Sequence, residues 1–164
     1  KYDTSAAGSK KSFNDYQVGE LIDHIDGNTI CEADHLFATR LWQNNSKVHF
    51  DINAREDRKR LTYGGHIISL VRALSFNGLE NAQLIVGING GTHANPVFAE
   101  DTIYCWSEVL DKIDLNVRNI AALRLRSVGT KEKNHNMKVK SDDGKYLPTT
   151  VLDFDYWVLV PKEL

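Results

Sequence analysis

The chain has 164 residues, enough for one domain that buries roughly 70% of the surface exposed by its unfolded form. Hydrophobic residues make up 41% of the chain, charged residues 26%, and the formal net charge is -2, which is typical of a soluble protein and lacks the basic excess that nucleic acid or an anionic membrane requires. The two cysteines, Cys31 and Cys105, form no C-x-x-C pair, so the sequence predicts neither a disulfide framework nor a cysteine metal site and favours a cytoplasmic location.

Residues 1–13 are rich in small and polar side chains and predict a flexible N-terminal arm or linker, followed by one folded domain over residues 14–164. The chain starts at Lys1 without an initiating Met and without an apolar signal-peptide region. We therefore expect that the native chain begins earlier. Residues 18–30 are compatible with an extended segment, interrupted by glycines.

A first helix is predicted from Thr29 onward, because Thr29 and Glu32 fit the capping-box pattern. Helical spacing predicts one buried apolar stripe on this helix, with polar residues that include His35 toward the rim. The stripe comprises Ala33, Leu36, Phe37 and Leu41. Asn44-Asn45-Ser46 is expected to end the helix.

Charged residues fill positions 54–60 without an apolar period, which predicts a solvated loop or a short helix. Beyond Gly64-Gly65, residues 66–76 are apolar on nearly every side and end at Asn77-Gly78. This pattern predicts a helix that is buried almost all round.

The remainder of the chain is strand-like over residues 83–89, 102–110, 121–130 and 150–160. The last segment alternates, with apolar side chains on one face and Asp153 and Asp155 on the other. One apolar helix and several long strands predict an α+β fold in which an antiparallel sheet wraps around a central helix.

Three segments, in chain order, carry a resemblance to a known family: His49-Phe50-Asp51, Gly64-Gly65-His66, and the run from Pro96 to Thr102. They resemble motifs of the MaoC-like hydratase family, whose hotdog fold curls an antiparallel sheet around one long helix. The resemblance spans residues 14–162 and is strongest to the subgroup that interconverts mesaconyl-CoA and β-methylmalyl-CoA. Chains of that subgroup carry two hotdog halves, and this sequence is similar to the C-terminal half.

The resemblance implies a hydro-lyase that acts on an acyl-CoA substrate, with no cofactor beyond the coenzyme A that the substrate carries. It also implies a partner, either a second copy in a homodimer or a second hotdog half. Two rivals stay open: an acyl-CoA thioesterase of the same fold, and a non-catalytic half that completes a partner's substrate tunnel.

The sequence departs from the family at two positions. The wider family has a catalytic Asp five residues before the His, where this chain has Asn44 before His49. An amide cannot take a proton from water. The family also has His-Gly at the start of the central helix, where this chain has Gly65-His66.

His49 and Asn44 are the catalytic candidates. An imidazole exchanges protons with water near neutral pH, so His49 is the expected general base or acid. Asn44 either orients a water molecule or caps the preceding helix, and residue type does not decide between these roles. Asp51 either holds the tautomer of His49 or caps the next turn, and capping is favoured.

Gly64, Gly65, His66 and Arg60 are the substrate-binding candidates. Open amides at the start of the central helix can stabilise a thioester oxygen that gains negative charge, although a plain tight turn also needs glycine. Arg60 and its basic neighbours can pair with phosphates or a carboxylate, but such a charge run is usually a solvated surface. His24, His35, His93 and His135 have no ligand spacing, so no metal site is expected.

Overall fold

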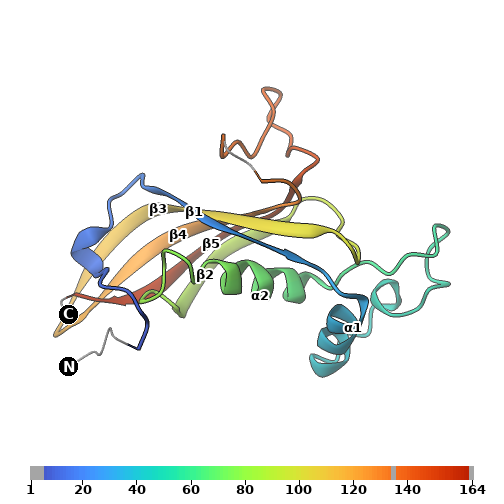
Figure 1. Ribbon diagram of the computed structural model, residues 1–164, viewed down its shortest axis with the longest axis horizontal. Coiled ribbons are helices and arrows are strands. Elements are labelled where there is room, and N and C mark those ends of the chain that lie inside the picture. The colour runs from blue at the N-terminus through green and yellow to red at the C-terminus, as the bar shows by residue number, and fades with distance from the viewer. Residues whose placement is uncertain (1–5, 134–135, 163–164) are drawn as a thin grey trace.

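The structure is a computed structural model that describes residues 6–133 and 136–162. Figure 1 shows a curved sheet with α2 along one face and α1 beyond one end of α2. In chain order the elements are η1 (Phe13–Asp15), β1 (Leu21–Thr29), α1 (Glu32–Leu41), η2 (Lys47–His49), α2 (Gly64–Leu74), β2 (Leu84–His93), β3 (Thr102–Val117), β4 (Ile120–Thr130) and β5 (Thr150–Pro161).

All neighbouring strands of the sheet are antiparallel, in the order β1-β3-β4-β5-β2. Helix α2 contacts β1, β3, β4 and β5, so the sheet wraps around it. This arrangement confirms the predicted α+β hotdog fold. β1 and β2 are the two edges, and β2 and β3 run further than predicted, to His93 and Val117. The polar and glycine-rich end of β2 hides its strand character in the sequence.

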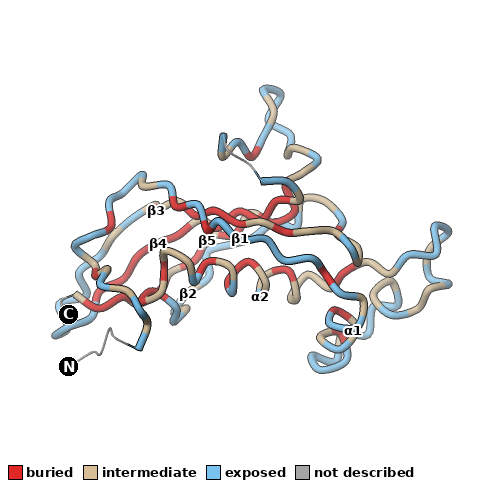
Figure 2. The backbone as a smooth tube through the Cα atoms, viewed as in Figure 1, coloured by how far each residue is buried: buried red, intermediate tan, exposed pale blue. Residues whose placement is uncertain are grey.

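β5 confirms the predicted alternation. Its apolar side chains face α2 and are at most 2% exposed: Leu152, Phe154, Tyr156, Val158 and Val160. The same core includes Ile67 and Val71 of α2, and Figure 2 shows buried backbone where helix and sheet meet. A Cβ atom on Gly129 would lie 2.8 Å from Cγ2 of Val71, so this glycine permits the close approach of α2 to the sheet.

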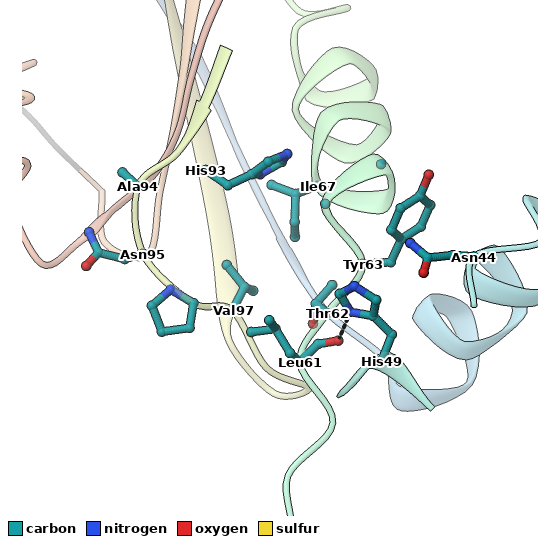
Figure 3. Close-up of a pocket in the computed structure, with 13 residues that line it drawn as sticks. Asn44, His49, Leu61, Thr62, Tyr63, Ile67, His93, Ala94, Asn95 and Val97 are labelled. Atoms are coloured by element: carbon teal, nitrogen blue, oxygen red, sulfur yellow. Dashed lines mark hydrogen bonds between the residues drawn. The ribbon is translucent and has the colours of Figure 1, made fainter. Parts of the chain in front are cut away.

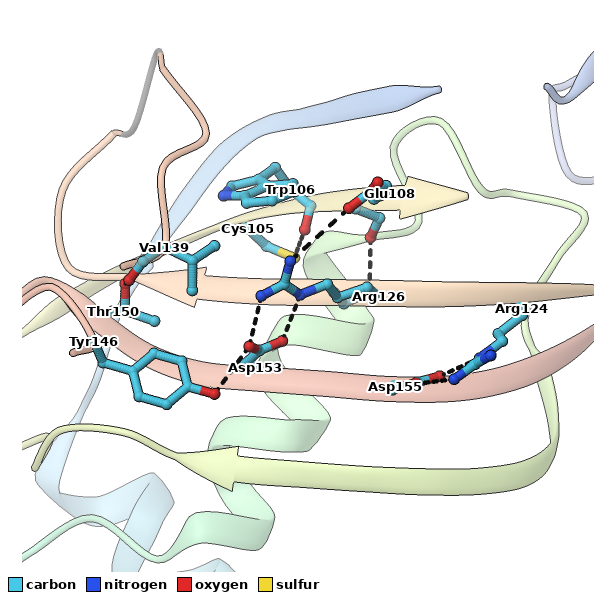
Figure 4. Close-up of polar contacts among 12 residues, drawn as sticks. Cys105, Trp106, Glu108, Arg124, Arg126, Val139, Tyr146, Thr150, Asp153 and Asp155 are labelled. Atoms are coloured by element: carbon cyan, nitrogen blue, oxygen red, sulfur yellow. Dashed lines mark hydrogen bonds and ion pairs between the residues drawn. The ribbon is translucent and has the colours of Figure 1, made fainter. Parts of the chain in front are cut away.

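The opposite face of the sheet carries paired charges (Figure 4) beside a second apolar cluster formed by Trp106, Val128 and Val139. Arg124 and Arg126 each make bidentate contacts, with Asp155 at 2.9 and 2.6 Å and with Asp153 at 2.7 and 2.7 Å. Tyr146 donates a further hydrogen bond to Asp153 at 3.0 Å. The outward Asp residues that the alternation predicted are therefore neutralised by a neighbouring strand.

Helix α2 is not buried all round, contrary to the prediction. Ser69 and Ala73 are exposed, and the buried face includes Arg72. The Arg72 guanidinium donates to Tyr156 Oη at 2.7 Å, to Ser75 Oγ at 2.9 Å and to carbonyl oxygens after the helix. A buried cation is tolerated because its donors are satisfied. The helix also ends earlier than predicted, at Leu74.

The prediction for α1 is wrong in two respects. Thr29 ends β1 and bonds Thr102 across the sheet, so the helix begins at Glu32 without the capping box. The apolar stripe is not buried, since Phe37 is 67% and Leu41 58% exposed, whereas His35 is fully buried. Periodicity identifies an apolar face, but a second surface must cover that face before it is buried.

The N-terminal segment lies only partly within the described residues. Positions 1–5 of the predicted arm lie outside them, and residues 6–12 contain no helix or strand. Asn81 Nδ2 donates to the carbonyl oxygens of Ser9 and Lys11 at 3.1 and 2.9 Å, which attaches this segment to the domain. The boundary between residues 13 and 14 remains a prediction.

Across residues 6–133 and 136–162, no helix is long and apolar enough to cross a membrane.

Candidate active site

A cavity of about 490 Å³ lies at the N-terminal end of α2. Three chain segments form its walls: the end of α1 with η2, the start of α2, and the stretch that follows β2 (Figure 3). The lining residues are Asn44, His49, Leu61, Thr62, Tyr63, Gly64, Gly65, Ile67, His93, Ala94, Asn95, Pro96 and Val97. The structure thus brings together Asn44, His49, Gly64 and Gly65 of the predicted site.

His49 is held in one orientation by the loop that follows it. Its Nδ1 lies 2.8 Å from the carbonyl oxygen of Leu61, and the Leu61 amide donates back to Val48 at 2.9 Å. Because a carbonyl oxygen only accepts, Nδ1 carries the proton and Nε2 of the neutral ring keeps its lone pair. The His49 ring also contacts Tyr63 edge to face, with centroids 5.8 Å apart. His49 can therefore accept a proton at Nε2.

Asn44 follows a Schellman motif that ends α1. Gln43 adopts a left-handed φ of 53°, its amide donates to Arg40, and the Asn44 amide donates to Thr39 at 3.0 Å. The side-chain Oδ1 of Asn44 accepts from the amide of Ser46 at 2.9 Å. Oδ1 is therefore already in use as an acceptor, and the Nδ2 group is the donor that Asn44 offers to the cavity.

Gly64 and Gly65, in the first turn of α2, line the cavity. The His66 amide donates to the Tyr63 carbonyl at 3.0 Å, whereas the amides of Gly64 and Gly65 have no backbone partner among the described residues. His66 does not line the cavity. The structure therefore offers Gly64 and Gly65, rather than His66, as open donors at the positive end of the helix. Burial lowers the pKa of His66 below its ordinary value, and nearby Asp34 opposes that shift.

Both glycines at this turn have a steric role. A Cβ atom on Gly64 would lie 2.6 Å from His93 Nε2, and one on Gly65 would lie 2.6 Å from Cζ of Tyr63. Glycine thus lets two side chains approach the helix end closely. His93 is a lining residue that the sequence reasoning did not assign to the site, because only the path of β2 brings it to α2.

Arg60 lies outside the cavity. Its guanidinium forms an ion pair with Glu32 and donates to the Phe50 carbonyl at 3.1 Å. Its charge is therefore already matched by a carboxylate. Asp51 accepts from the amide of Asn53 at 2.9 Å, which agrees with the favoured capping role.

The other basic residues of the loop form a surface group. Arg55 pairs with Asp57, and the charged groups of Arg55, Lys59 and Lys131 lie over the ring of Phe98. These contacts fit the solvated surface that the charge run predicted.

Among residues 6–133 and 136–162, no cluster of three His, Cys, Asp or Glu side chains is placed to hold a metal ion. His135 lies outside the described residues.

Similar proteins are known, although no family model matches the chain. It is 56% identical over 161 residues to the mesaconyl-CoA hydratase of Cereibacter sphaeroides and 54% identical over 166 residues to the beta-methylmalyl-CoA dehydratase of Chloroflexus aurantiacus. Each match covers 98% of this chain but 47% of the relative. The chain therefore spans about half the length of the curated relatives that it matches.

A solved structure gives the same result. The putative MaoC domain protein dehydratase from Chloroflexus aurantiacus matches with a TM-score of 0.94 and 50% identity, over 99% of this chain and 48% of that chain. The sequence and the architecture thus agree with one half of a longer protein of this kind. The chain belongs to the MaoC-like hotdog proteins, as a domain that corresponds to about half of these longer relatives.

Proposed function

We propose that this domain is a hydro-lyase that adds water reversibly across the double bond of a 2-enoyl-CoA, with mesaconyl-CoA and β-methylmalyl-CoA as the pair of compounds. The names of its two relatives support this choice of substrate. The observation that carries the proposal is the joint presence of His49, Asn44 and two open helix amides around one cavity. No cofactor is needed beyond the coenzyme A of the substrate.

His49 acts on the water molecule in this mechanism. Its Nε2 accepts a proton as the water oxygen bonds to the β-carbon of the enoyl thioester, and the electron pair of the double bond moves toward the thioester oxygen. The same imidazolium then returns the proton to the α-carbon, which leaves the ring neutral. Fixing Nδ1–H on the Leu61 carbonyl keeps Nε2 available for both steps.

Asn44 donates to the water oxygen through Nδ2. Its Oδ1 accepts from Ser46, which fixes the amide plane. In the reverse direction, the same Nδ2–H group supports the departing hydroxyl while His49 protonates it. A donor at this position fits dehydration, where negative charge develops on the leaving oxygen.

Gly64 and Gly65 bind the thioester oxygen. This oxygen becomes negative in the enolate, and the two amides point from the positive end of α2. Fixed donors of this type stabilise the transition state more than the neutral substrate, which is what accelerates the reaction.

The thioesterase alternative is less well supported by the cavity. Hydrolysis of a thioester in this fold would need a carboxylate near the helix, and the described lining residues include neither Asp nor Glu. Asp51, the nearest such residue in the motif, caps the turn at Asn53 instead.

A second hotdog domain is the proposed partner, either in a homodimer or as another half of a longer chain. β2 is an edge strand of 10 residues, and three of its apolar side chains, Leu84, Val86 and Ile88, are between 54% and 65% exposed. A long apolar edge favours pairing with another strand.

We expect the cytoplasm as the compartment, which suits the free thiols of Cys31 and Cys105.

The decisive experiment incubates purified protein with mesaconyl-CoA while two signals are recorded. Loss of the enoyl-thioester absorbance without release of free thiol is the expected result. Thiol release in step with substrate loss would identify a thioesterase. If folded protein causes neither loss of the absorbance nor release of thiol, catalysis by this chain is contradicted and the non-catalytic half is favoured.

A further inference from the structure

The proposed mechanism leaves one imidazole of the cavity without a role. His93 is the last residue of β2, and its ring lies on the wall opposite His49 (Figure 3). Neither ring nitrogen of His93 has a hydrogen-bond partner within the described part of the chain. The packing that holds this ring beside α2 lowers the pKa of His93 below its ordinary value.

His93 is an exposed residue whose ring approaches the start of α2. Its Nε2 lies against Gly64, where a Cβ atom would approach within 2.6 Å. The ring thus stands beside the positive end of α2, next to an open amide. A negatively charged group of a ligand at this point would meet a helix terminus and an imidazole together.

The Thr62 and Tyr63 hydroxyls also line the cavity, but both are neutral donors. Among the described lining residues there is no Lys or Arg. The amide of Asn95 already donates to the carbonyl oxygens of Leu147 and Thr150 at 2.9 and 2.7 Å. His49 donates to Leu61 and uses its other nitrogen in the proposed proton transfer. His93 is therefore the remaining lining side chain that can carry a positive charge.

We propose that His93 binds the distal carboxylate of the acyl group and selects dicarboxylic enoyl-CoA substrates over their monocarboxylic counterparts. This inference rests on the proposed function, because mesaconyl-CoA carries such a carboxylate at the end of its acyl group. An imidazole N–H donates to a carboxylate in a charge-assisted hydrogen bond, and the carboxylate favours the protonated ring. An acyl group that ends in methyl would leave His93 without a partner.

The test compares two substrates that differ in one group. Mesaconyl-CoA and (E)-2-methylbut-2-enoyl-CoA share the thioester, the double bond and the branch, and the second replaces the carboxylate with methyl. The ratio of their kcat/KM values is measured for wild type, His93→Leu, His93→Gln and Arg60→Gln. Arg60→Gln is the matched control, since Arg60 is a cation beside the site but outside the cavity.

The ratio is expected to fall roughly 10- to 100-fold in His93→Leu, mainly through KM for mesaconyl-CoA, as the loss of a hydrogen bond to a charged group predicts. His93→Gln keeps an N–H donor without the charge and should fall between wild type and His93→Leu. The ratio should stay at the wild-type value in Arg60→Gln. An unchanged ratio in both His93 variants would overturn the proposal, and a fall confined to Arg60→Gln would move carboxylate recognition to the surface loop.

A binding measurement separates this inference from the proposed function. Calorimetry with saturated analogues, methylsuccinyl-CoA and 2-methylbutyryl-CoA, reports carboxylate recognition without turnover. Tighter binding of methylsuccinyl-CoA that disappears in His93→Leu supports the role of His93 even in a protein that hydrates nothing. Equal affinity for the two analogues in wild type would refute it even in an active hydratase.

Discussion

His49 is the side chain on which the proposed chemistry depends, because its Nε2 is the free nitrogen of an oriented ring. We expect His49→Ala to lower hydration of mesaconyl-CoA roughly 10²- to 10⁴-fold, the usual contribution of general acid–base catalysis. His66→Ala is the control, because His66 is a nearby imidazole that does not line the cavity. Steady-state kinetics on variants with unchanged circular dichroism decide the matter. Activity of His49→Ala within a few-fold of wild type would contradict the assignment.

Asn44 combines a structural and a proposed catalytic contact in one side chain. Asn44→Ala removes both, and we expect it to cost about 2–4 kcal/mol of transition-state stabilisation and about 1 kcal/mol of stability from the lost hydrogen bond to the Ser46 amide. Asn44→Asp keeps an acceptor for the Ser46 amide but loses the Nδ2 donor, so its melting temperature should stay near that of wild type. Kinetics and thermal melts on the same preparations separate the two roles.

Two outcomes bear on the donor role of Asn44. Reduced turnover in Asn44→Asp supports donation to the water or hydroxyl oxygen. Equal turnover of wild type and Asn44→Ala, per folded molecule, would leave Asn44 as a helix-terminating residue only and favour the non-catalytic half.

At the scale of secondary structure, the first turn of α2 connects a helix that packs in the core to the cavity of the candidate site. Gly65 permits the Tyr63 ring to lie over the helix end, and a Cβ atom there would reach within 2.6 Å of that ring. We expect Gly65→Ala to displace Tyr63 and reduce kcat/KM roughly 10- to 100-fold, as small misplacements in a site do. Stability should change little, since alanine is the better helix former.

The matched control for this prediction is Ser69→Ala, one turn further along the exposed side of α2. Ser69 Oγ donates to the Gly65 carbonyl at 3.0 Å, so this variant perturbs the same turn without entering the cavity. Turnover should remain within a few-fold of wild type in Ser69→Ala. Comparable losses in the two variants would mean that the whole turn, rather than clearance above Gly65, sets activity.

At the scale of the whole molecule, buried imidazoles make stability depend on pH. Burial lowers the pKa of His24 and His35, both of which are 0% exposed, below 6.5. The unfolded chain therefore binds protons at a higher pH than the folded chain, so the free energy of unfolding falls as pH drops below about 6.5. Each such group contributes at most about 1.4 kcal/mol per pH unit.

His35 is the best position at which to test this dependence. Its ring is fully buried, and neither nitrogen has a hydrogen-bond partner in the described part of the chain. Nε2 lies 3.9 Å from Glu32 Oε2, whose charge opposes the lowering of the His35 pKa by burial. Replacing it with leucine should cost little at pH 7.5, because no partner is left unsatisfied. Urea unfolding at pH 7.5, 6 and 5 should show a shallower loss of stability in His35→Leu than in wild type. An identical slope would contradict the prediction.

The open edge of the sheet leads to a prediction about assembly. If β2 pairs with a second hotdog domain, light scattering at micromolar concentration should report a dimer for this chain. Ile88→Lys places a charge on the exposed edge and should shift the distribution toward monomer. Val18→Lys is the control, since Val18 is 60% exposed and lies outside the strands. A stable wild-type monomer would contradict pairing between copies of this chain.

Local sequence patterns by themselves determined much of this fold. The alternation of β5 predicts its buried face because strand side chains alternate with a period of two, whatever surface they meet. The segments around His49 and Gly64-Gly65 identified two walls of the cavity. Short polar motifs between apolar elements are visible without knowledge of the tertiary structure.

Tertiary structure alone decided which surfaces are covered and which distant residues meet. Phe37 lies on the apolar side of α1 yet is exposed, while His35 on the other side is fully buried. His93 enters the cavity because β2 pairs with β5 and ends beside α2, whereas the charge of Arg60 is matched by Glu32 outside it. Periodicity reports only the polarity of a face. Burial and proximity depend on strand register and on partners far away in the chain.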